Sequence, residues 1–447
     1  MTEGTIAAIA TPHGRGALAM LRMSGMNAAQ VAGAVVSPWP LPPRAARLCS
    51  LRDTETGELL DRAIVVHFPA PRSYPGEDVV ELTVHGGPAV APAVLAALVT
   101  AGAREAEPGE FTRRAVLGGR MDLVQAEAVG DLTEARTSAA RQAALNQVDG
   151  GLSRRIAALR DEIIGLEALI AYDIDFPEED DGPVSAERIQ SAASRVTAGL
   201  ESLLATADGG SLVRDGAVVV IAGPPNAGKS SLFNALLGEE RAIVTEVAGT
   251  TRDAIEALLD TRPIPLRLVD TAGLRETSEV LERIGIEVSA RWLAGAHLVL
   301  ACGETDHDAL TTAEKVRTFT AAPVIVVRTK SDLRAGPRDN AAPLAASAHT
   351  GAGLPALLRA IQDQLAAERP LPTGNEPIVT RARQRRALAE ALEELKSFRT
   401  AWSAGELPAP VAAVHTRAAI HALETLVGGV DVEEVLGRVF SDFCVGK

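Results

Sequence analysis

The chain has 447 residues, with 44 lysines and arginines against 58 aspartates and glutamates, which gives a formal net charge of −14. This length predicts two to four domains, each large enough to bury its own core. The negative balance argues against a broad electrostatic surface for nucleic acid, so any nucleic acid must be reached locally or through a partner.

The three cysteines, Cys49, Cys302 and Cys444, are odd in number and lack C-x-x-C spacing, which argues against a disulfide framework or a zinc site. The first residues lack the basic start and continuous apolar core of a signal peptide, and no run of 18 apolar residues follows. We therefore expect a soluble, cytoplasmic protein. For Cys444, a small buried residue is favoured over a redox or nucleophilic role.

Residues 1–120 predict a compact α+β domain. The β-rich runs "GALAMLRMSG", "RAIVVHFPA" and "DVVELTVHGG" alternate with Gly/Pro turns, and "PAVAPAVLAALVTAG" is the one helical candidate. Residues 121–214 contain long Ala/Leu/Ile-rich segments with helical period, interrupted by the acidic "DIDFPEEDDGP". They predict the first part of a helical domain.

Residues 215–370 alternate buried-strand and helix patterns. The strand candidates "GAVVVIAG", "LRLVD", "HLVLAC" and "PVIVVRT" are separated by helical pieces, which predicts a doubly wound parallel sheet. Residues 371–447 begin with a Pro/Gly-rich linker and then return to helical period. We therefore expect the helical domain to resume there, with the sheet domain inserted into it.

The stretch "GPPNAGKSS" satisfies the G-x-x-x-x-G-K-[ST] pattern and lies between a predicted strand and a predicted helix. Its glycines allow backbone N–H groups to face phosphate oxygens at a helix N-terminus. Lys229 would neutralise the β- and γ-phosphates, and the Ser230 hydroxyl would ligate Mg²⁺. This motif alone leaves ATP and GTP open.

Two later motifs follow predicted strands and favour GTP. In "LRLVDTAGLRE", the Asp270 carboxylate can hold a metal-bound water, and Gly273 can offer its amide to the γ-phosphate. In "VIVVRTKSDL", the Asp332 carboxylate can accept two hydrogen bonds from guanine that adenine cannot donate, while the Lys330 stem covers the base. The later "SAH", residues 347–349, can present a backbone N–H to guanine O6.

The P-loop, "GTTRD", "DTAG", "TKSD" and "SAH", in this order, resemble a translation-factor-class GTPase. The flanking motifs "ATPHGRGALAMLRMSG", "YPGEDVVELTVHGG", "PGEFTRRAVLGGRMDLVQAEAVGDL", "DIDFPEED" and "FCVGK" resemble the MnmE (TrmE) family over essentially the whole chain. The resemblance implies a multidomain α+β protein. Its parts are an N-terminal tetrahydrofolate-binding and dimerisation domain (1–120), a helical domain (121–214 and 371–447) and an inserted Ras-like P-loop GTPase domain (215–370).

The resemblance further implies a K⁺-stimulated GTP hydrolase that works with the FAD protein MnmG, as a homodimer within a heterotetramer or larger complex. Together they would add an aminomethyl or carboxymethylaminomethyl group at C5 of the wobble uridine of certain tRNAs. A folate such as 5-formyltetrahydrofolate would carry the one-carbon unit. We expect MnmG to carry most tRNA binding, and direct contact through arginines such as those in "RARQRR" stays open.

Two alternatives belong to other classes. One is a GTP-gated scaffold with little turnover, and the other is a ribosome-assembly GTPase, which would be expected to carry a basic RNA-binding appendage that this sequence does not show.

Family members bind K⁺ where two GTPase domains meet, and the resemblance assigns its ligands to Asn226, Thr245, Val247 and Thr250. Thr251 would join Ser230 in holding Mg²⁺. The monovalent cation would take the place of an arginine finger, for which Arg252 and Arg275 are the rival candidates. The residues expected to contact GTP are Asn226, Ala227, Gly228, Lys229, Ser230, Ser231, Thr245, Glu246, Val247, Ala248, Gly249, Thr250, Thr251, Asp270, Thr271, Ala272, Gly273, Thr329, Lys330, Ser331, Asp332, Ser347, Ala348 and His349.

Glu282 matches the family residue that orients the attacking water, although a glutamate on an amphipathic helix is more often only part of a solvated face. For folate, the resemblance assigns Arg22, Glu81, Arg120 and Lys447. A carboxylate can receive pterin N–H groups, and cations can meet the anionic glutamate tail.

The chain departs from the family at two positions. Relatives usually carry Asn where Thr329 stands, and that asparagine ties the base-recognition loop to the P-loop, so we expect guanine selectivity with weaker affinity. Relatives often carry Lys where Arg120 stands, and arginine keeps the charge but not the shape.

Overall fold

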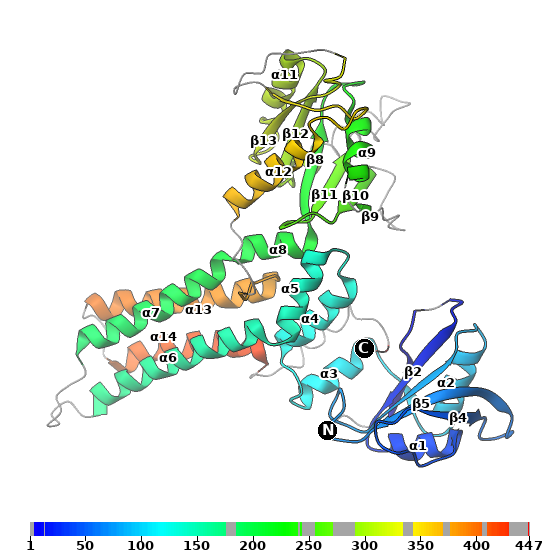
Figure 1. Ribbon diagram of the computed structural model, residues 1–447. Helices are drawn as coiled ribbons and strands as arrows, with labels where there is room; N and C mark the ends of the chain where they lie inside the picture. The colour runs from blue at the N-terminus through cyan, green and yellow to red at the C-terminus, as the bar shows by residue number, and fades with distance from the viewer. Residues whose placement is uncertain are drawn as a thin grey trace. The chain divides into compact units, whose positions relative to one another are not determined.

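The structure is a computed structural model that describes residues 4–12, 14–175, 185–239, 242–243, 255–270, 291–333, 343–369, 376–404, 409–428 and 446 (Figure 1). The chain divides into two compact units. Unit 1 comprises residues 1–130 and 424–447, and unit 2 comprises residues 131–423.

Unit 1 is built on a sheet whose described strands follow the order β3-β4-β5-β6-β2-β1-β7. Neighbouring strands are antiparallel except β1 and β7, which are parallel. The strands are β1 (Ile6–Ile9), β2 (Leu18–Ser24), β3 (Val36–Ser37), β4 (Arg47–Arg52), β5 (Leu59–Phe68), β6 (Val79–His85) and β7 (Arg104–Glu105). The three β-rich runs recognised in the sequence correspond to β2, β5 and β6.

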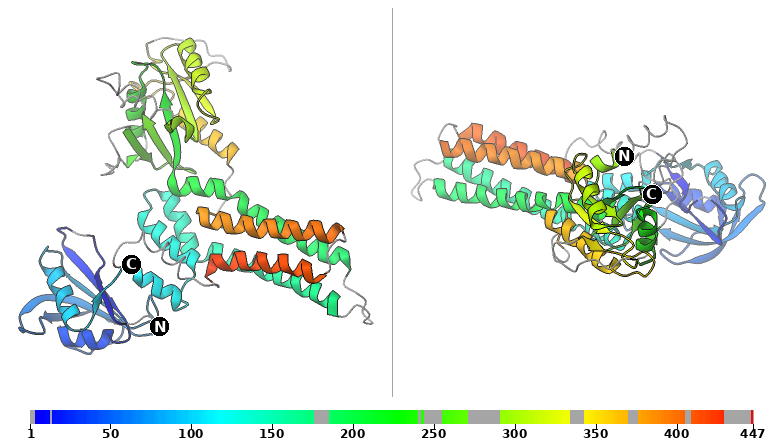
Figure 2. Two further views of the ribbon diagram at one scale, coloured as in Figure 1. Left: turned by 180° about the vertical axis from the view of Figure 1, so that it is seen from behind. Right: turned by 90° about the horizontal axis from the view of Figure 1, so that it is seen from above.

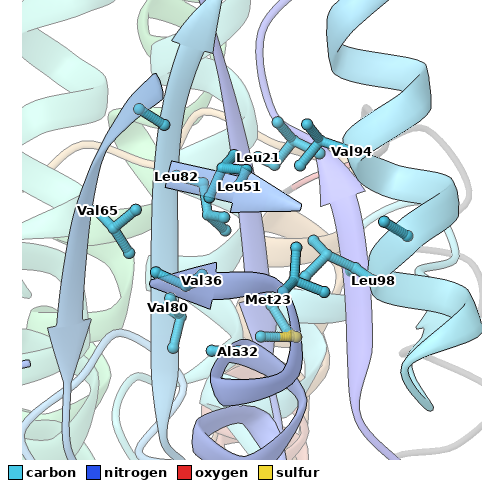
Figure 3. Close-up of a cluster of buried hydrophobic side chains, with 14 of the residues drawn as sticks. Leu21, Met23, Ala32, Val36, Leu51, Val65, Val80, Leu82, Val94 and Leu98 are labelled. Carbon is cyan, nitrogen blue, oxygen red and sulfur yellow. The ribbon is translucent and has the colours of Figure 1, made fainter. Parts of the chain in front are cut away.

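One face of this sheet carries the main apolar core of unit 1. Leu21 and Met23 of β2 and Leu82 of β6 are fully buried and pack with residues of the helices α1 (Ala28–Val35) and α2 (Val90–Thr100). Figure 3 shows Val94 and Leu98 of α2 lying over these strands. Because side chains alternate along a strand, the residues between these apolar ones face the opposite side of the sheet.

The helices of unit 1 differ from the sequence expectation. The expected helix is present as α2, but α1 and α3 (Glu110–Leu117) were not predicted. Each is eight residues long. So short a helix gives little periodic signal and is stabilised mainly by the tertiary packing of one face, which a single sequence does not reveal.

In the sequence of unit 2, long helices come before and after the residues of the sheet domain. Figures 1 and 2 show α6, α7, α13 and α14 running side by side. In α6, Ile156, Leu159, Ile163, Leu166 and Ile170 form a buried stripe at helical spacing. The helices are α4 (Leu123–Glu134), within which the division between the units falls, α5 (Ser138–Val148), α6 (Gly151–Asp175), α7 (Ala186–Ala205), α8 (Ala207–Asp215), α13 (Ala382–Ala404) and α14 (Ala409–Val427).

The segments that leave and rejoin the helices lie against each other. The Val379 N–H donates to the Thr206 hydroxyl at 3.0 Å. A Cβ atom at Gly210 of α8 would collide with the Val379 carbonyl oxygen, so only glycine allows this approach. Among the helices of the described residues, none has both the length and the hydropathy of a membrane span.

The residues between these segments form a sheet in the order β14-β13-β12-β8-β11-β10-β9. Val219 and Ile221 of the central strand β8 pack toward α9 and α12, whereas Val220 and Ala222 lie in the cluster that contains Val316 of α11. Helices therefore cover both faces. The elements are β8 (Ala217–Ala222), α9 (Lys229–Glu239), β9 (Ala242–Ile243), β10 (Ile255–Leu259), β11 (Leu266–Asp270), β12 (Leu298–Gly303), α11 (Asp306–Val316), β13 (Val324–Arg328), β14 (Leu344–Ala345) and α12 (Leu354–Glu368).

The predicted doubly wound sheet is present, with one difference at its edge. The strands β8, β11, β12, β13 and β14 are parallel, but β9 and β10 are antiparallel to their neighbours. Only residues 260–265 join β10 to β11, and such a short connection permits an antiparallel pair but not a parallel one.

Candidate functional site

The loop between β8 and α9 has the backbone shape of a phosphate cradle. Asn226 and Gly228 have φ angles of 65° and 77°, in the left-handed region. Gly223 is packed so closely that an added Cβ would lie 2.5 Å from the Cys302 carbonyl oxygen. Alternating backbone conformations of this kind turn successive N–H groups toward one point, where they can bind an anion.

A cation and a carboxylate follow adjacent parallel strands: Lys229 begins the helix after β8, and Asp270 is the last residue of β11. Lys229 is buried, and its Nζ donates to the Pro224 carbonyl oxygen at 2.9 Å, across the loop. Asp270, 1% exposed, ends β11, which pairs with β8. Ser230 is exposed in the first turn of α9, where its hydroxyl is free to meet a metal ion beside a phosphate. These donors fit a Mg²⁺–polyphosphate ligand.

Cys302 of β12 forms part of the floor beneath the loop. The side chain is fully buried, and burial raises the pKa of its thiol to about 12. The thiol is therefore neutral at physiological pH and packs as a small apolar group.

A cavity of about 190 Å³ opens beside the loop and brings three of the predicted motifs together. Its walls come from the start of α9, from the end of β13 and from the segment after β14. It is lined by Gly228, Ser231, Leu232, Thr329, Lys330, Asp332, Leu333, Ala346, Ala348 and His349. A cavity of this size and position suits one planar base of a nucleotide held by the loop.

The polar side of this cavity is a fixed carboxylate. The buried Ser347 hydroxyl donates to Asp332 Oδ1 at 2.6 Å, and it accepts from the backbone N–H groups of His349 at 3.3 Å and Thr350 at 3.2 Å. The hydrogen bond from Ser347 lowers the pKa of the Asp332 carboxyl. The carboxylate is therefore ionised and oriented to accept hydrogen bonds from a base.

Thr329 ties the base side of the site to the P-loop. Its hydroxyl lies 2.6 Å from the Ala227 carbonyl oxygen and 3.1 Å from that of Gly303, and its N–H donates to the Gly303 oxygen at 2.9 Å. The side chain is 3% exposed. Threonine thus makes the connection between the two loops that the family resemblance assigned to asparagine.

Lys330 joins the same two loops by its ammonium group. Its Nζ donates to the Asn226 carbonyl oxygen at 2.9 Å and forms an ion pair with Glu304, and its own backbone has a φ of 53°. Glu304 was not among the sequence candidates. The only sequence signal for Glu304 was its position directly after the buried strand β12, because the other candidates also follow the carboxyl ends of parallel strands.

Several predicted residues lie outside the described part of the chain, so the structure does not place them. They are Thr245, Glu246, Val247, Ala248, Gly249, Thr250 and Thr251, with Thr271, Ala272 and Gly273, the rival fingers Arg252 and Arg275, and Glu282, Cys444 and Lys447.

In unit 1, two of the folate candidates form a pair on the sheet face opposite α1 and α2. Arg22 of β2 is the register partner of Glu81 of β6, and their side chains form an ion pair at 2.8 Å. The Arg22 guanidinium also lies over the rings of Tyr74 and Phe111, 5.6 and 5.8 Å from their centroids. Tyr74 and Phe111 were missed, although both occur in the quoted motifs "YPGED" and "PGEF".

Arg120 belongs to the same unit. A Cβ atom at Gly76, in the "YPGED" loop, would lie 3.3 Å from Arg120 Cγ, so the arginine stem packs on this loop. Gly446 is buried against the end of β1, where its added Cβ would lie 2.8 Å from Ala10 Cα. The residue before Lys447 thus contacts the N-terminal sheet.

The arginines of "RARQRR" are partly neutralised within unit 2. Arg381 donates to both oxygens of Asp131, at 2.6 and 3.2 Å, and Arg385 pairs with Asp208 at 2.7 Å. These contacts leave less free positive charge for nucleic acid than the sequence alone indicates.

The doubly wound sheet, the P-loop and the carboxylate-lined base cavity define the GTPase class of P-loop proteins. The comparison with protein-family models narrows the assignment. The model described as the MnmE helical domain matches residues 123–444, and the model described as the GTP-binding protein TrmE N-terminus matches residues 5–120.

Relatives of known name match along nearly their whole length. Proteins named tRNA modification GTPase MnmE are 46% identical in Methylobacterium radiotolerans, covering 99% of both chains, and 42% identical in Akkermansia muciniphila, covering 100% of this chain and 99% of that protein. The Aquifex aeolicus protein of that name is 40% identical over 99% of both. The chain therefore belongs to the MnmE family of tRNA modification GTPases.

Proposed function

We propose that this chain is a K⁺-stimulated GTP hydrolase whose cycle drives a conformational step in the modification of tRNA wobble uridine at C5, together with MnmG. The observation that carries the GTP assignment is the base cavity with the ionised Asp332 carboxylate fixed by Ser347. Guanine can donate to both carboxylate oxygens from N1–H and N2–H₂, whereas adenine has no such pair of donors.

The described residues of the phosphate side, Lys229 and Ser230 among them, support this proposal. Lys229 and the loop N–H groups would hold the β- and γ-phosphates, and Ser230 with Thr251 would hold Mg²⁺. Asn226 would hold K⁺, with the remaining oxygens from Thr245, Val247 and Thr250. When bound, the two cations supply positive charge where negative charge develops between the phosphates.

Water attack requires a group that orients the water. We assign this role to Glu282, and the N–H of Gly273 would contact the γ-phosphate. Thr329 and Lys330 hold the base loop against the P-loop, which keeps base recognition and phosphate binding in one geometry.

Unit 1 is proposed to hold the folate. Arg22, Glu81, Arg120 and Lys447 would contact a tetrahydrofolate such as 5-formyltetrahydrofolate, and the ion pair of Arg22 with Glu81 supports a shared role. The proposed domains are 1–120 for folate binding and dimerisation, 121–214 and 371–447 for the helical domain, and 215–370 for the GTPase. We place the homodimer and its complex with MnmG in the cytoplasm.

Steady-state hydrolysis by the purified protein tests the central proposal. Rates would be measured with GTP and with ATP, in KCl and in NaCl at equal ionic strength. We expect turnover that depends on GTP and is much faster in KCl. Identical rates in the two salts would contradict the potassium mechanism, and equal rates with ATP would contradict the role of Asp332.

A variant Glu282→Ala separates the enzyme from a GTP-gated scaffold. An enzyme should lose most of its turnover and still bind GTP. A scaffold would show feeble turnover before and after the change.

A further inference from the structure

The turn between β10 and β11, residues 260–265, contacts the start of helix α5 within unit 2. The Asp260 carboxylate accepts hydrogen bonds from the Ser138 N–H at 2.9 Å and the Ser138 hydroxyl at 3.0 Å. Arg262 Nε donates to the same hydroxyl oxygen at 3.1 Å. Thr137 is the N-cap residue of α5, and its side chain accepts a hydrogen bond from the Ala140 N–H. A carboxylate at a helix N-terminus is favourable because it meets free N–H groups and the positive end of the helix dipole.

The turn is held rigidly on the side of the GTPase sheet. Gln362 of α12 donates from Nε2 to the Thr261 hydroxyl oxygen at 3.0 Å and to the Ile264 carbonyl oxygen at 2.7 Å. The Ile264 N–H donates back to Gln362 Oε1 at 3.3 Å. The turn must therefore move together with α12 and the sheet.

The same hairpin reaches the nucleotide site. Its register runs from Leu259 opposite Leu266, beside the turn, to Ile255 opposite Asp270, at the phosphate end. Five residue pairs span about 15 Å. The buried Ala257 and Leu268 fix the hairpin in the sheet core. A shift of the strand end at Asp270 would thus be transmitted along a stiff element to the turn.

The far end of α5 contacts the segment that returns from the GTPase domain. Gln147 Nε2 donates to the Ile378 carbonyl oxygen and to the Thr380 hydroxyl oxygen, both at 3.0 Å. Between these two ends lies a cavity of about 910 Å³, lined among others by Gln142, Asn146 and Arg262. The contact at Ser138 is therefore a small polar one with open space beside it, which hydration can replace at low cost, unlike a packed apolar interface.

We propose that the β10–β11 turn is a releasable latch on α5, through which the nucleotide state of the GTPase site changes the position of the helical domain. Asp260 is the positioning residue of this latch, because it holds both polar groups of Ser138. This inference rests on the proposed function, because GTP binding and hydrolysis would supply the movement that opens the latch.

Hydrogen–deuterium exchange on the full chain tests the latch. The amides of residues 138–141 would be compared in KCl with GDP and with GDP–aluminium fluoride, in the wild type, in Asp260→Ala and in Asp363→Ala. Asp363 is an exposed carboxylate on α12 next to Gln362, and it serves as the matched control. We expect wild type and control to exchange at different rates in the two nucleotide states. Asp260→Ala should exchange about fivefold faster in the nucleotide state that protects these amides more in the wild type, and should lose the difference between the states.

Two results would overturn the latch: no nucleotide dependence of these amides in the wild type, or a wild-type dependence retained in Asp260→Ala. If Asp260→Ala folds poorly, Arg262→Ala removes one of the three contacts and should reduce the difference instead. GTP turnover measured on the same samples keeps the two proposals apart. If Asp260→Ala loses the nucleotide dependence of amide exchange but hydrolyses GTP normally, the result bears on the latch alone. If the wild type does not hydrolyse GTP, the proposed function itself is contradicted.

Discussion

Thr329 makes, with a hydroxyl group, the connection that the family resemblance assigns to asparagine. Its hydroxyl has one proton, and the nearer of its two carbonyl neighbours is that of Ala227 in the P-loop. The tie therefore consists of one hydrogen bond between parts of the chain that are 102 residues apart. An asparagine amide, with two protons, could serve both carbonyls at once.

Replacing Thr329 with Val keeps the shape but leaves the Ala227 carbonyl without its donor. A buried acceptor without a partner costs about 1–3 kcal/mol, so we expect GTP and GDP to bind about tenfold more weakly, with little change in turnover at saturating GTP. Titration with a fluorescent guanine nucleotide measures this. Thr329→Asn restores a donor and should bind within about threefold of the wild type. Equal affinity in the Val variant would show that the tie contributes nothing.

At the level of single residues, the sequence predicted those residues of the candidate GTP site that belong to short local motifs. Lys229, Asp270, Asp332 and Ser347 were named from short motifs in a fixed order, and the structure places them at the candidate site. Glu304 was not, since its pairing with Lys330 joins two loops 26 residues apart and follows no local pattern. Tyr74 and Phe111 were missed for the same reason, because only the fold brings their rings to Arg22.

Among the elements, α3 is anchored by a buried ion network. Glu110 accepts from Arg104 Nη1 at 2.8 Å and from Arg114 Nη2 at 2.9 Å, and Arg114 also pairs with Glu77 at 3.0 Å. Burial alone would raise the pKa of the Glu110 carboxyl. The hydrogen bonds from Arg104, the Glu107 amide and Arg114 outweigh this effect and lower the pKa to about 2.

This pKa predicts the acid sensitivity of unit 1. Because the folded pKa lies below the ordinary value of 4.5, Glu110 stabilises the fold fully above pH 4.5, and the stabilisation is lost as the pH falls toward 2. We expect Glu110→Gln to be less stable at pH 7 but to lose less stability on acidification. Urea unfolding of both proteins at pH 7, 5 and 3 tests this. Parallel declines in the two proteins would contradict the network's role.

Two helical glycines predict opposite effects of the same substitution. An added Cβ at Gly210 of α8 would meet the Val379 carbonyl oxygen, whereas at Gly165 of α6 it would meet nothing within 4 Å. We expect Gly210→Ala to lower the urea midpoint and Gly165→Ala to raise stability by about 0.5–1 kcal/mol, since alanine favours a helix. Comparing the two variants separates close packing from intrinsic helix propensity, and a stabilised Gly210→Ala would rule out the close approach.

The longer helices and seven of the strands were predictable because each has an apolar pattern of its own period; these strands are β2, β5, β6, β8, β11, β12 and β13. The strands β1, β3, β4, β7, β9, β10 and β14 match none of the predicted runs. The helices α1 and α3 were not, because eight residues carry too few turns. The antiparallel edge of the second sheet was also missed, since pairing direction follows from the turn at residues 260–265 and not from the hydrophobicity of β10.

For the whole molecule, the contacts around Thr206, Gly210 and Val379 predict that the GTPase domain is separable. Its two connections lie side by side, with Arg214 Nη1 3.5 Å from the Thr380 carbonyl oxygen. Replacing residues 216–375 with a short Gly/Ser linker should leave a folded helical protein that does not bind GTP, because the gap to bridge is small. Circular dichroism and nucleotide titration check both properties. A collapsed helical signal would show that the helices depend on the inserted domain.

The division of the chain also sets an order of events during synthesis. Unit 1 takes its residues from both sides of unit 2, and within unit 2 the helices take theirs from both sides of the GTPase sheet. On a ribosome, which delivers the chain from the N-terminus, the N-terminal sheet has all its described strands once residue 105 has emerged, and the GTPase sheet follows once residue 345 has emerged. The helical bundle must wait for α13 and α14, and unit 1 receives its contact between Gly446 and Ala10, after β1, only when the chain is nearly complete. The unit whose strands are translated first therefore receives its last described contact when the rest of the chain has been made.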